Sequence, residues 1–390
     1  MKAFPLSPVD YIFTGVGSQP ITFCFYYNKN LDPDLLRKGL NETLNYFPIL
    51  RSKLVKISKT DYEFHTSDDG LTFQVSDSNV AFEKSKSIEK YIMPVRTIEE
   101  KPLTKITLTQ TPKGSFLAVS VSHALVDGFS FFYFFSSWAR ICRGESIIIK
   151  PSLERTVFSS YLKSSKKTFT SNDIYSNCGL FYGNKRSNWQ GGPINEERIL
   201  ISKDTIRDYL KEVENERDIS LSENDILTAL LWKNYIPSWI KENDNPVTYV
   251  TCPFDFRRAL SDFPNNYFGC SICFTTASID LSSLSKVSIG DLAILVRNSV
   301  NKVRSDYVVR SLQTLESLRK QKGLEVMEEI HLRHPNHGMI VTNLTRLPIR
   351  ELDFGAGIPV DFLTYVDVLG GAAILPAVKG VEILVAHPPK

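Results

Sequence analysis

A chain of 390 residues that is 42% hydrophobic, 23% charged and 11% aromatic has the composition of a globular protein that folds in water. This composition excludes collagen-like, disordered and membrane-embedded classes. A formal charge of +3 without a dense basic stripe gives no sign of nucleic-acid binding. The length is too great for one ordinary core and suits two, so we expect two globular halves.

The N-terminal residues and the cysteines indicate the compartment. The stretch from Met1 to Pro8 lacks a sustained apolar run and a cleavage site, so no signal peptide is predicted. No segment reaches the roughly 18 consecutive apolar residues of a membrane span. Of the six cysteines only Cys270 and Cys273 lie close together, inside residues 267–277, which we interpret as a strand. We interpret the cysteines as reduced core residues of a cytoplasmic protein.

The first half alternates predicted strands and helices. β-Branched and aromatic residues predict a strand over 21–27, and a proline-glycine turn joins two further strands over 103–110 and 115–122. Apolar residues at helical spacing predict a helix over 31–46, which Pro48 ends. Residues 128–143 predict a helix that is apolar all round and therefore buried on most sides.

The second half repeats this alternation after a long polar stretch. Residues 163–192 are rich in Ser, Lys, Asn and Gly and show no periodicity, which indicates a segment that crosses between two domains. The strands expected to follow lie over 197–201, 247–253, 267–277, 339–343 and 372–377. Helices are expected over 203–213 and 222–232, and residues 289–320 are expected to be largely helical. We predict an α/β fold divided into domains 1–170 and 196–390, joined by a crossover loop over 171–195.

His123 is the histidine best placed for chemistry. It ends an apolar strand, and a short turn follows with Asp127 and then Gly128. A strand end holds a side chain rigidly while the turn exposes it, which is what a general base requires. From the residues alone, a structural histidine in the core is an equal alternative. The clustered His331, His334 and His337 have no Asp, Glu or Cys in ligand register, so no metal site is predicted.

The segment from His123 to Gly128, His-Ala-Leu-Val-Asp-Gly, resembles the HxxxDG signature of the BAHD acyltransferases. These belong to the larger clan of coenzyme A-dependent acyltransferases and condensation domains. Further segments resemble landmarks of the family, in the same order along nearly the whole chain: Leu6-Ser7-Pro8-Val9-Asp10, Asn45-Tyr46-Phe47-Pro48, Trp138-Ala139-Arg140, Asp255-Phe256-Arg257-Arg258, Tyr267-Phe268-Gly269 and Leu352-Asp353-Phe354-Gly355-Ala356-Gly357.

Several positions depart from the family pattern. Ala356 replaces the tryptophan of DFGWG, and Cys270 replaces the asparagine of YFGN. Leu344 stands where a tryptophan that borders the acceptor pocket is common, which argues against a typical phenolic acceptor. Condensation domains usually carry a second histidine where this chain has Ser122, and this favours free acyl-CoA as the donor.

The resemblance implies two chloramphenicol-acetyltransferase-like domains with a channel between them. Acyl-CoA and a small-molecule alcohol or amine would reach His123 from opposite faces, in a secondary-metabolism enzyme that is monomeric and needs no metal or resident cofactor. The roles it implies are His123 as base, Thr342 as oxyanion donor, Asn343 and Leu344 at the substrate, and structural roles for Asp127, Gly128, Arg257, Asp353 and Gly355. It also implies that Asp127 points away from the histidine and pairs with an arginine, for which Arg257 is the candidate.

Two alternatives remain open at this point. The first is a condensation-type enzyme that takes its acyl group from a carrier protein. The second is a small-molecule-binding protein that keeps the fold without catalysis. Acyl transfer from free acyl-CoA would argue against both.

Overall fold

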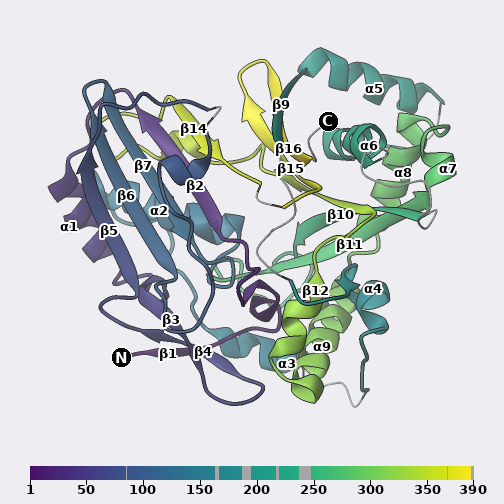
Figure 1. The fold of residues 1–390 in the computed structure, drawn as a ribbon, viewed down its shortest axis with the longest axis horizontal. Helices are drawn as coiled ribbons and strands as arrows, with labels where there is room; N and C mark the ends of the chain where they lie inside the picture. The colour runs from purple at the N-terminus through teal and green to yellow at the C-terminus, as the bar shows by residue number, and fades with distance from the viewer. Residues whose placement is uncertain are drawn as a thin grey trace.

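The computed structural model describes the chain except for residues 85, 163–166, 187–194, 217–218, 237–246, 367 and 388–390. Two large β-sheets lie side by side, and helices pack on each (Figure 1). The strands are β1 Ala3–Pro5, β2 Ile21–Tyr27, β3 Ser52–Lys56, β4 Tyr62–Thr66, β5 Leu71–Asp77, β6 Thr104–Thr111, β7 Gly114–Val121, β8 Phe181–Tyr182, β9 Asn195–Ser202, β10 Val247–Asp255, β11 Ile272–Asp280, β12 Ile330–His331, β13 Gly338–Asn343, β14 Asp361–Thr364, β15 Gly371–Ala377 and β16 Gly380–His387. The α-helices are α1 Pro33–Thr43, α2 Gly128–Cys142, α3 Phe158–Leu162, α4 Asp173–Cys178, α5 Lys203–Glu216, α6 Glu223–Tyr235, α7 Leu281–Leu284, α8 Ile289–Val300 and α9 Ser305–Lys322.

The first sheet has the strand order β14-β2-β7-β6-β5 and carries α1 and α2 (Figure 1). Helix α1 begins where sequence chemistry places it, because the Asp32 carboxylate accepts hydrogen bonds from two backbone N–H groups and Pro33 opens the first turn. Helix α2 buries most of its large aromatic side chains in the same core as both α1 and the sheet. The predicted helix that is buried on most sides is therefore confirmed.

The second sheet has the strand order β11-β10-β13-β15-β16-β9. Its central strands β10, β13 and β15 run parallel, and β11, β16 and β9 add antiparallel edges. Helices α5, α6 and α8 cover this sheet and share a separate apolar core with it (Figure 1). The predicted α/β class is confirmed.

One strand from the second half of the chain belongs to the sheet of the first half. Strand β14 lies late in the sequence, yet it pairs antiparallel with β2 and completes the edge of the first sheet. The segment predicted as a crossover loop, 171–195, includes α4 and β8, and its residues 187–194 lie outside the described part of the chain. The division at 1–170, 171–195 and 196–390 stays a prediction.

Three predicted elements differ from the structure. The stretch expected to be helical over 289–320 forms two helices, α8 and α9, because the chain leaves helical geometry over residues 301–304. The strand expected over 267–277 begins only at Ile272, because the carbonyl oxygens of Tyr267 and Gly269 accept hydrogen bonds from Arg257 instead of joining a sheet. The helix expected over 31–46 spans Pro33–Thr43, and tighter turns carry the chain from Thr43 toward Pro48. All six cysteines are buried free thiols. In the described residues, none of the helices has the length and apolar character that crossing a bilayer requires.

Candidate active site

His123 lies in the turn between β7 and α2. The hydroxyl of Ser122 fixes this turn, since it accepts a hydrogen bond from the Ala124 N–H at 3.2 Å and shares one with Thr97 at 2.7 Å. The Ser122 hydroxyl is therefore occupied within the turn. The imidazole of His123 remains partly exposed, and one of its faces is stacked on the ring of Phe13.

The surroundings of His123 favour the neutral imidazole. Burial lowers its pKa below the usual 6.5, and the Asp127 charge and the carbonyls of His123 and Val126 offset only part of this effect. Within the described residues, the shielded Nδ1 has no hydrogen-bond partner of acceptable geometry. A histidine that is neutral at pH 7 can accept a proton, as a general base must.

The Asp127 carboxylate is directed away from the imidazole and is fully occupied. Its Oδ1 accepts from the Ser130 N–H at 2.8 Å, which caps α2, and from Arg257 at 3.1 Å. Its Oδ2 accepts from the Ser271 N–H at 2.9 Å and pairs with Arg257 at 2.7 Å. Burial alone would raise the pKa of Asp127, but Arg257 and these N–H donors lower it below 3.8. The predicted Asp127–Arg257 pair is confirmed.

Arg257 connects the two halves of the molecule. Its guanidinium bonds Asp127, the Ser130 hydroxyl at 3.0 Å and the carbonyl oxygens of Tyr267 and Gly269, and it also pairs with Asp255 at 3.0 Å. Although burial acts to lower the pKa of Arg257, the two carboxylates outweigh it and raise the pKa. The guanidinium therefore stays charged and fixes the start of α2, and with it the turn that carries His123.

Thr342, Asn343 and Leu344 lie at the end of β13. Ile340 and Leu344 pack against the first core, whereas Met339 and Val341 lie in the second core. Since side chains alternate along a strand, Thr342 shares the face of Ile340 and Leu344, which packs against the core that also contains the residues on both sides of His123. Asn343 lies on the opposite face, where its amide donates to Asn224 at 2.9 Å and accepts from Thr345.

The segment from Leu352 to Gly357 is part of the first core. The Asp353 carboxylate accepts hydrogen bonds from the N–H groups of Gly355 and Gly357 at 2.8 and 2.9 Å, and both glycines have positive φ. Phe354 packs on Trp138, ten residues beyond the start of α2 and about 15 Å along its axis. Asp353 and Gly355 thus shape a turn at the far end of α2 from His123.

Gly128 opens α2 with an ordinary backbone conformation. A Cβ atom added there would meet no heavy atom within 4 Å, so the turn itself does not require glycine. Sequence reasoning missed Phe13, Ser130 and Ser271. The contacts of these residues join segments that are far apart in the chain, so no local sequence pattern predicts them.

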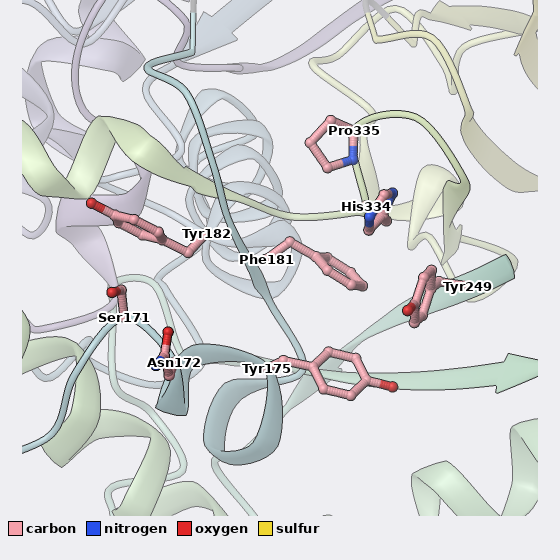
Figure 2. Close-up of a pocket in the computed structure, with 8 residues that line it drawn as sticks. All are labelled: Ser171, Asn172, Tyr175, Phe181, Tyr182, Tyr249, His334 and Pro335. Atoms are coloured by element: carbon pink, nitrogen blue, oxygen red, sulfur yellow. The ribbon is translucent and has the colours of Figure 1, made fainter. Parts of the chain in front are cut away.

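A separate cavity of about 340 Å³ lies between α4, β8 and the loop before β13 (Figure 2). Its lining contains none of the residues assigned to the reaction. His334 stacks on Tyr249 and on His337, and burial lowers its pKa to about 4. In the described chain, no group of three or more His, Cys, Asp or Glu is arranged to hold a metal. The residues that line the cavity are Ser171, Asn172, Tyr175, Phe181, Tyr182, Tyr249, His334 and Pro335.

The fold is that of the two-domain proteins of the chloramphenicol-acetyltransferase type. The family model described as the Transferase family, that of the BAHD acyltransferases, matches residues 1–390, so the chain belongs to this family and is an acyltransferase.

The relatives that the chain resembles are diverse. It is 25% identical to a hydroxycinnamoyl-CoA:piscidic acid hydroxycinnamoyltransferase of Actaea racemosa, over 81% of this chain and 75% of that protein. It is 21% identical to an omega-hydroxypalmitate O-feruloyl transferase of Arabidopsis thaliana, over 90% and 76% respectively.

Solved structures share the fold. F. graminearum TRI101 complexed with coenzyme A and T-2 mycotoxin superposes with a TM-score of 0.78 at 14% identity, over 99% of this chain and 95% of that one. Vinorine synthase gives a TM-score of 0.71 at 19% identity, over 99% and 90%.

Proposed function

We propose that this acyltransferase moves an acyl group from acyl-CoA to a hydroxyl or amine of a small-molecule acceptor by direct transfer, with His123 as general base. The observation that carries the proposal is the placement of His123, whose partly exposed ring is held at a rigid turn and whose pKa is lowered by burial. The Asp127 carboxylate binds Arg257 and the start of α2 and does not bind the imidazole. In this proposal the histidine therefore acts without a catalytic triad.

The reaction follows from this arrangement. His123 Nε2 takes the proton of the acceptor hydroxyl or amine as the acceptor attacks the thioester carbonyl. The carbonyl oxygen becomes an oxyanion, which the Thr342 hydroxyl stabilises. The intermediate collapses, the carbon–sulfur bond breaks, and the imidazolium returns its proton to the leaving thiolate. The products are the acylated acceptor and free coenzyme A, and the proposed reaction uses no metal or resident cofactor.

The character of the acceptor depends on Leu344. Relatives named for piscidic acid, omega-hydroxypalmitate and 5-hydroxyanthranilate show that acceptor names vary widely within the family. A leucine at the site gives an aliphatic wall in place of an aromatic one, which favours an acceptor without an aromatic ring next to its nucleophile. We further propose that the protein works as a cytoplasmic monomer, in keeping with its six free cysteines.

A panel assay tests the function directly. Purified protein is incubated with acetyl-, malonyl-, hydroxycinnamoyl- and long-chain acyl-CoA donors against aliphatic alcohols, phenols and amines, and the release of free thiol is measured. Turnover that depends on both substrates supports the proposal. Turnover only with an acyl group on a carrier protein would favour the condensation-type alternative. Ser122, which stands where condensation domains usually carry a second histidine, argues against that alternative.

Direct transfer predicts that the acyl group is never attached to the protein. The Ser122 hydroxyl is held by Thr97 and Ala124, and burial raises the pKa of the Cys270 thiol well above its usual range, so neither is an activated nucleophile. Intact-mass spectrometry after incubation with acyl-CoA alone should show the unmodified mass. An adduct that disappears when acceptor is added would overturn direct transfer.

Thr342→Val tests the oxyanion role. Valine keeps the shape of the side chain and removes the hydroxyl, so kcat should fall by about 10²–10³-fold, the usual cost of losing one oxyanion donor, with KM almost unchanged. Steady-state kinetics on both substrates measure this. Thr345→Val serves as the matched control, because its hydroxyl bonds Asn343. A rise in KM alone for Thr342→Val would make the hydroxyl a substrate-binding contact instead.

A further inference from the structure

Phe13 lies flat against the imidazole of His123. The two ring centroids are 4.1 Å apart and the ring planes differ by 9°. Phe13 is only 1% exposed, so its ring is part of the core that supports the site. No other aromatic contact of His123 is present among the described residues, so the Phe13 ring is the aromatic group that lies against the imidazole.

An ion pair holds Phe13 from its N-terminal side. Phe13 ends a short 3₁₀ turn that begins at Asp10. The Asp10 carboxylate pairs with Arg155, and both side chains are at most 1% exposed. The same carboxylate accepts the Ser7 N–H at 2.7 Å. The turn that carries Phe13 is thus anchored in the interior by a buried charge pair.

The C-terminal side of Phe13 is tied to the turn of His123 itself. The Gly15 N–H donates to the Thr97 carbonyl at 2.9 Å, and the Thr97 hydroxyl shares a hydrogen bond of 2.7 Å with Ser122. Ser122 immediately precedes His123. The same hydrogen bonds therefore hold the segments that carry Phe13 and His123, and the fold determines the position of one ring against the other.

The stack can stabilise the positive charge that His123 acquires as a base, for which the site offers no free carboxylate among the described residues. When His123 takes a proton the ring becomes positive, yet Asp127 is committed to Arg257, Ser130 and Ser271. The carbonyls of His123 and Val126 and the distant Asp127 charge are the other groups that favour the protonated ring. The face of an aromatic ring attracts a cation at this distance.

We propose that Phe13 is a positioning residue of the reaction, whose ring face holds the imidazole of His123 and stabilises the positive charge that it acquires. This inference rests on the proposed function of His123 as base. Phe13 would supply, through its π-face, the orientation and charge stabilisation that a carboxylate supplies in a Ser-His-Asp triad.

The decisive experiment replaces Phe13 with phenylalanines that carry one, two and five fluorine atoms. Fluorine withdraws charge from the ring face with little change in shape, so packing is kept while the attraction for a cation weakens. NMR titration of His123 should show its pKa falling stepwise along the series, by up to about 1.5. Since a weaker stack disfavours the protonated ring, the acid limb of kcat/KM should move to lower pH in parallel. A His123 pKa that is constant across the series would overturn the proposal.

Phe13→Leu provides a test without unnatural residues. Loss of the ring should lower kcat by about 2- to 30-fold with KM little changed, and Phe13→Tyr should restore most of the rate. Phe116→Leu is the matched control, because Phe116 is equally buried but lies in a different aromatic cluster, with Tyr26, Phe82 and Tyr91. Equal losses of kcat in both leucine variants would reduce Phe13 to ordinary packing. The NMR titration does not depend on turnover, so it separates failure of this inference from failure of His123 as base.

Discussion

Replacing His123 by alanine should lower kcat by at least about 100-fold while the protein remains folded. A general base contributes about 10²–10⁴-fold in enzymes. The side chain is partly exposed and its Nδ1 has no hydrogen-bond partner in the described chain. Its removal therefore leaves no hydrogen-bonding group unpaired. It uncovers one face of the buried Phe13 ring, so the melting temperature should fall only modestly.

The measurement is steady-state turnover with saturating acyl-CoA and acceptor, together with a thermal melt. His65→Ala is a suitable control, since His65 lies in β4 and bonds Glu63 in the small sheet β1-β4-β3. It should keep wild-type turnover. If His123→Ala also turned over at a near-normal rate, the assignment of the base would be wrong. The roles proposed for Thr342 and Phe13 would then be wrong as well, because both assume that His123 is the base.

The sequence predicted local features well because local chemistry determines them. Strand β2 has the predicted bounds, since a run of β-branched and aromatic residues has few other stable conformations. The start of α1 at the Asp32 cap and Pro33 is equally local. His123 was identified because an apolar strand, a turn and a buried helix follow each other directly. The local pattern does not separate a catalytic histidine from a core histidine, and the family resemblance is what favours the catalytic role.

Features made by distant contacts escaped the sequence. The stretch from Tyr267 to Cys270 has strand composition, but the carbonyls of Tyr267 and Gly269 turn to the buried guanidinium of Arg257. The same is true of β14, which joins a sheet formed by the first third of the chain. The stack of Phe13 on His123 has no local signal either, because it depends on how two turns meet in space. Tertiary interactions override local propensity at these positions.

Arg257→Ala should destabilise the protein by about 3–5 kcal/mol, because it leaves the buried Asp127 carboxylate with only its two N–H donors. The side chains of this pair are 3% and 2% exposed, so the carboxylate is left inside the protein without its cationic partner. Asp127→Ala should cost less, because Arg257 keeps its second partner Asp255. Both variants should lose activity through distortion of the turn that carries His123.

Chemical denaturation and turnover of the two single variants and the double variant test this coupling. The double variant should be much less destabilised than the sum of the single ones, because neither charge is then left unpaired. Asp255→Ala is the control on the same guanidinium; Asp255 is 47% exposed, so its loss should cost at most about 1 kcal/mol. A catalytic triad predicts a different pattern, in which Asp127→Asn keeps full stability, lowers kcat selectively and leaves Arg257 without influence. Strict additivity of the destabilisation in Asp127→Ala and Arg257→Ala would contradict the structural role. Strong coupling, together with a reduced melting temperature in Asp127→Asn, would establish that this carboxylate joins the two halves of the enzyme. His123 would then act as base without a carboxylate partner.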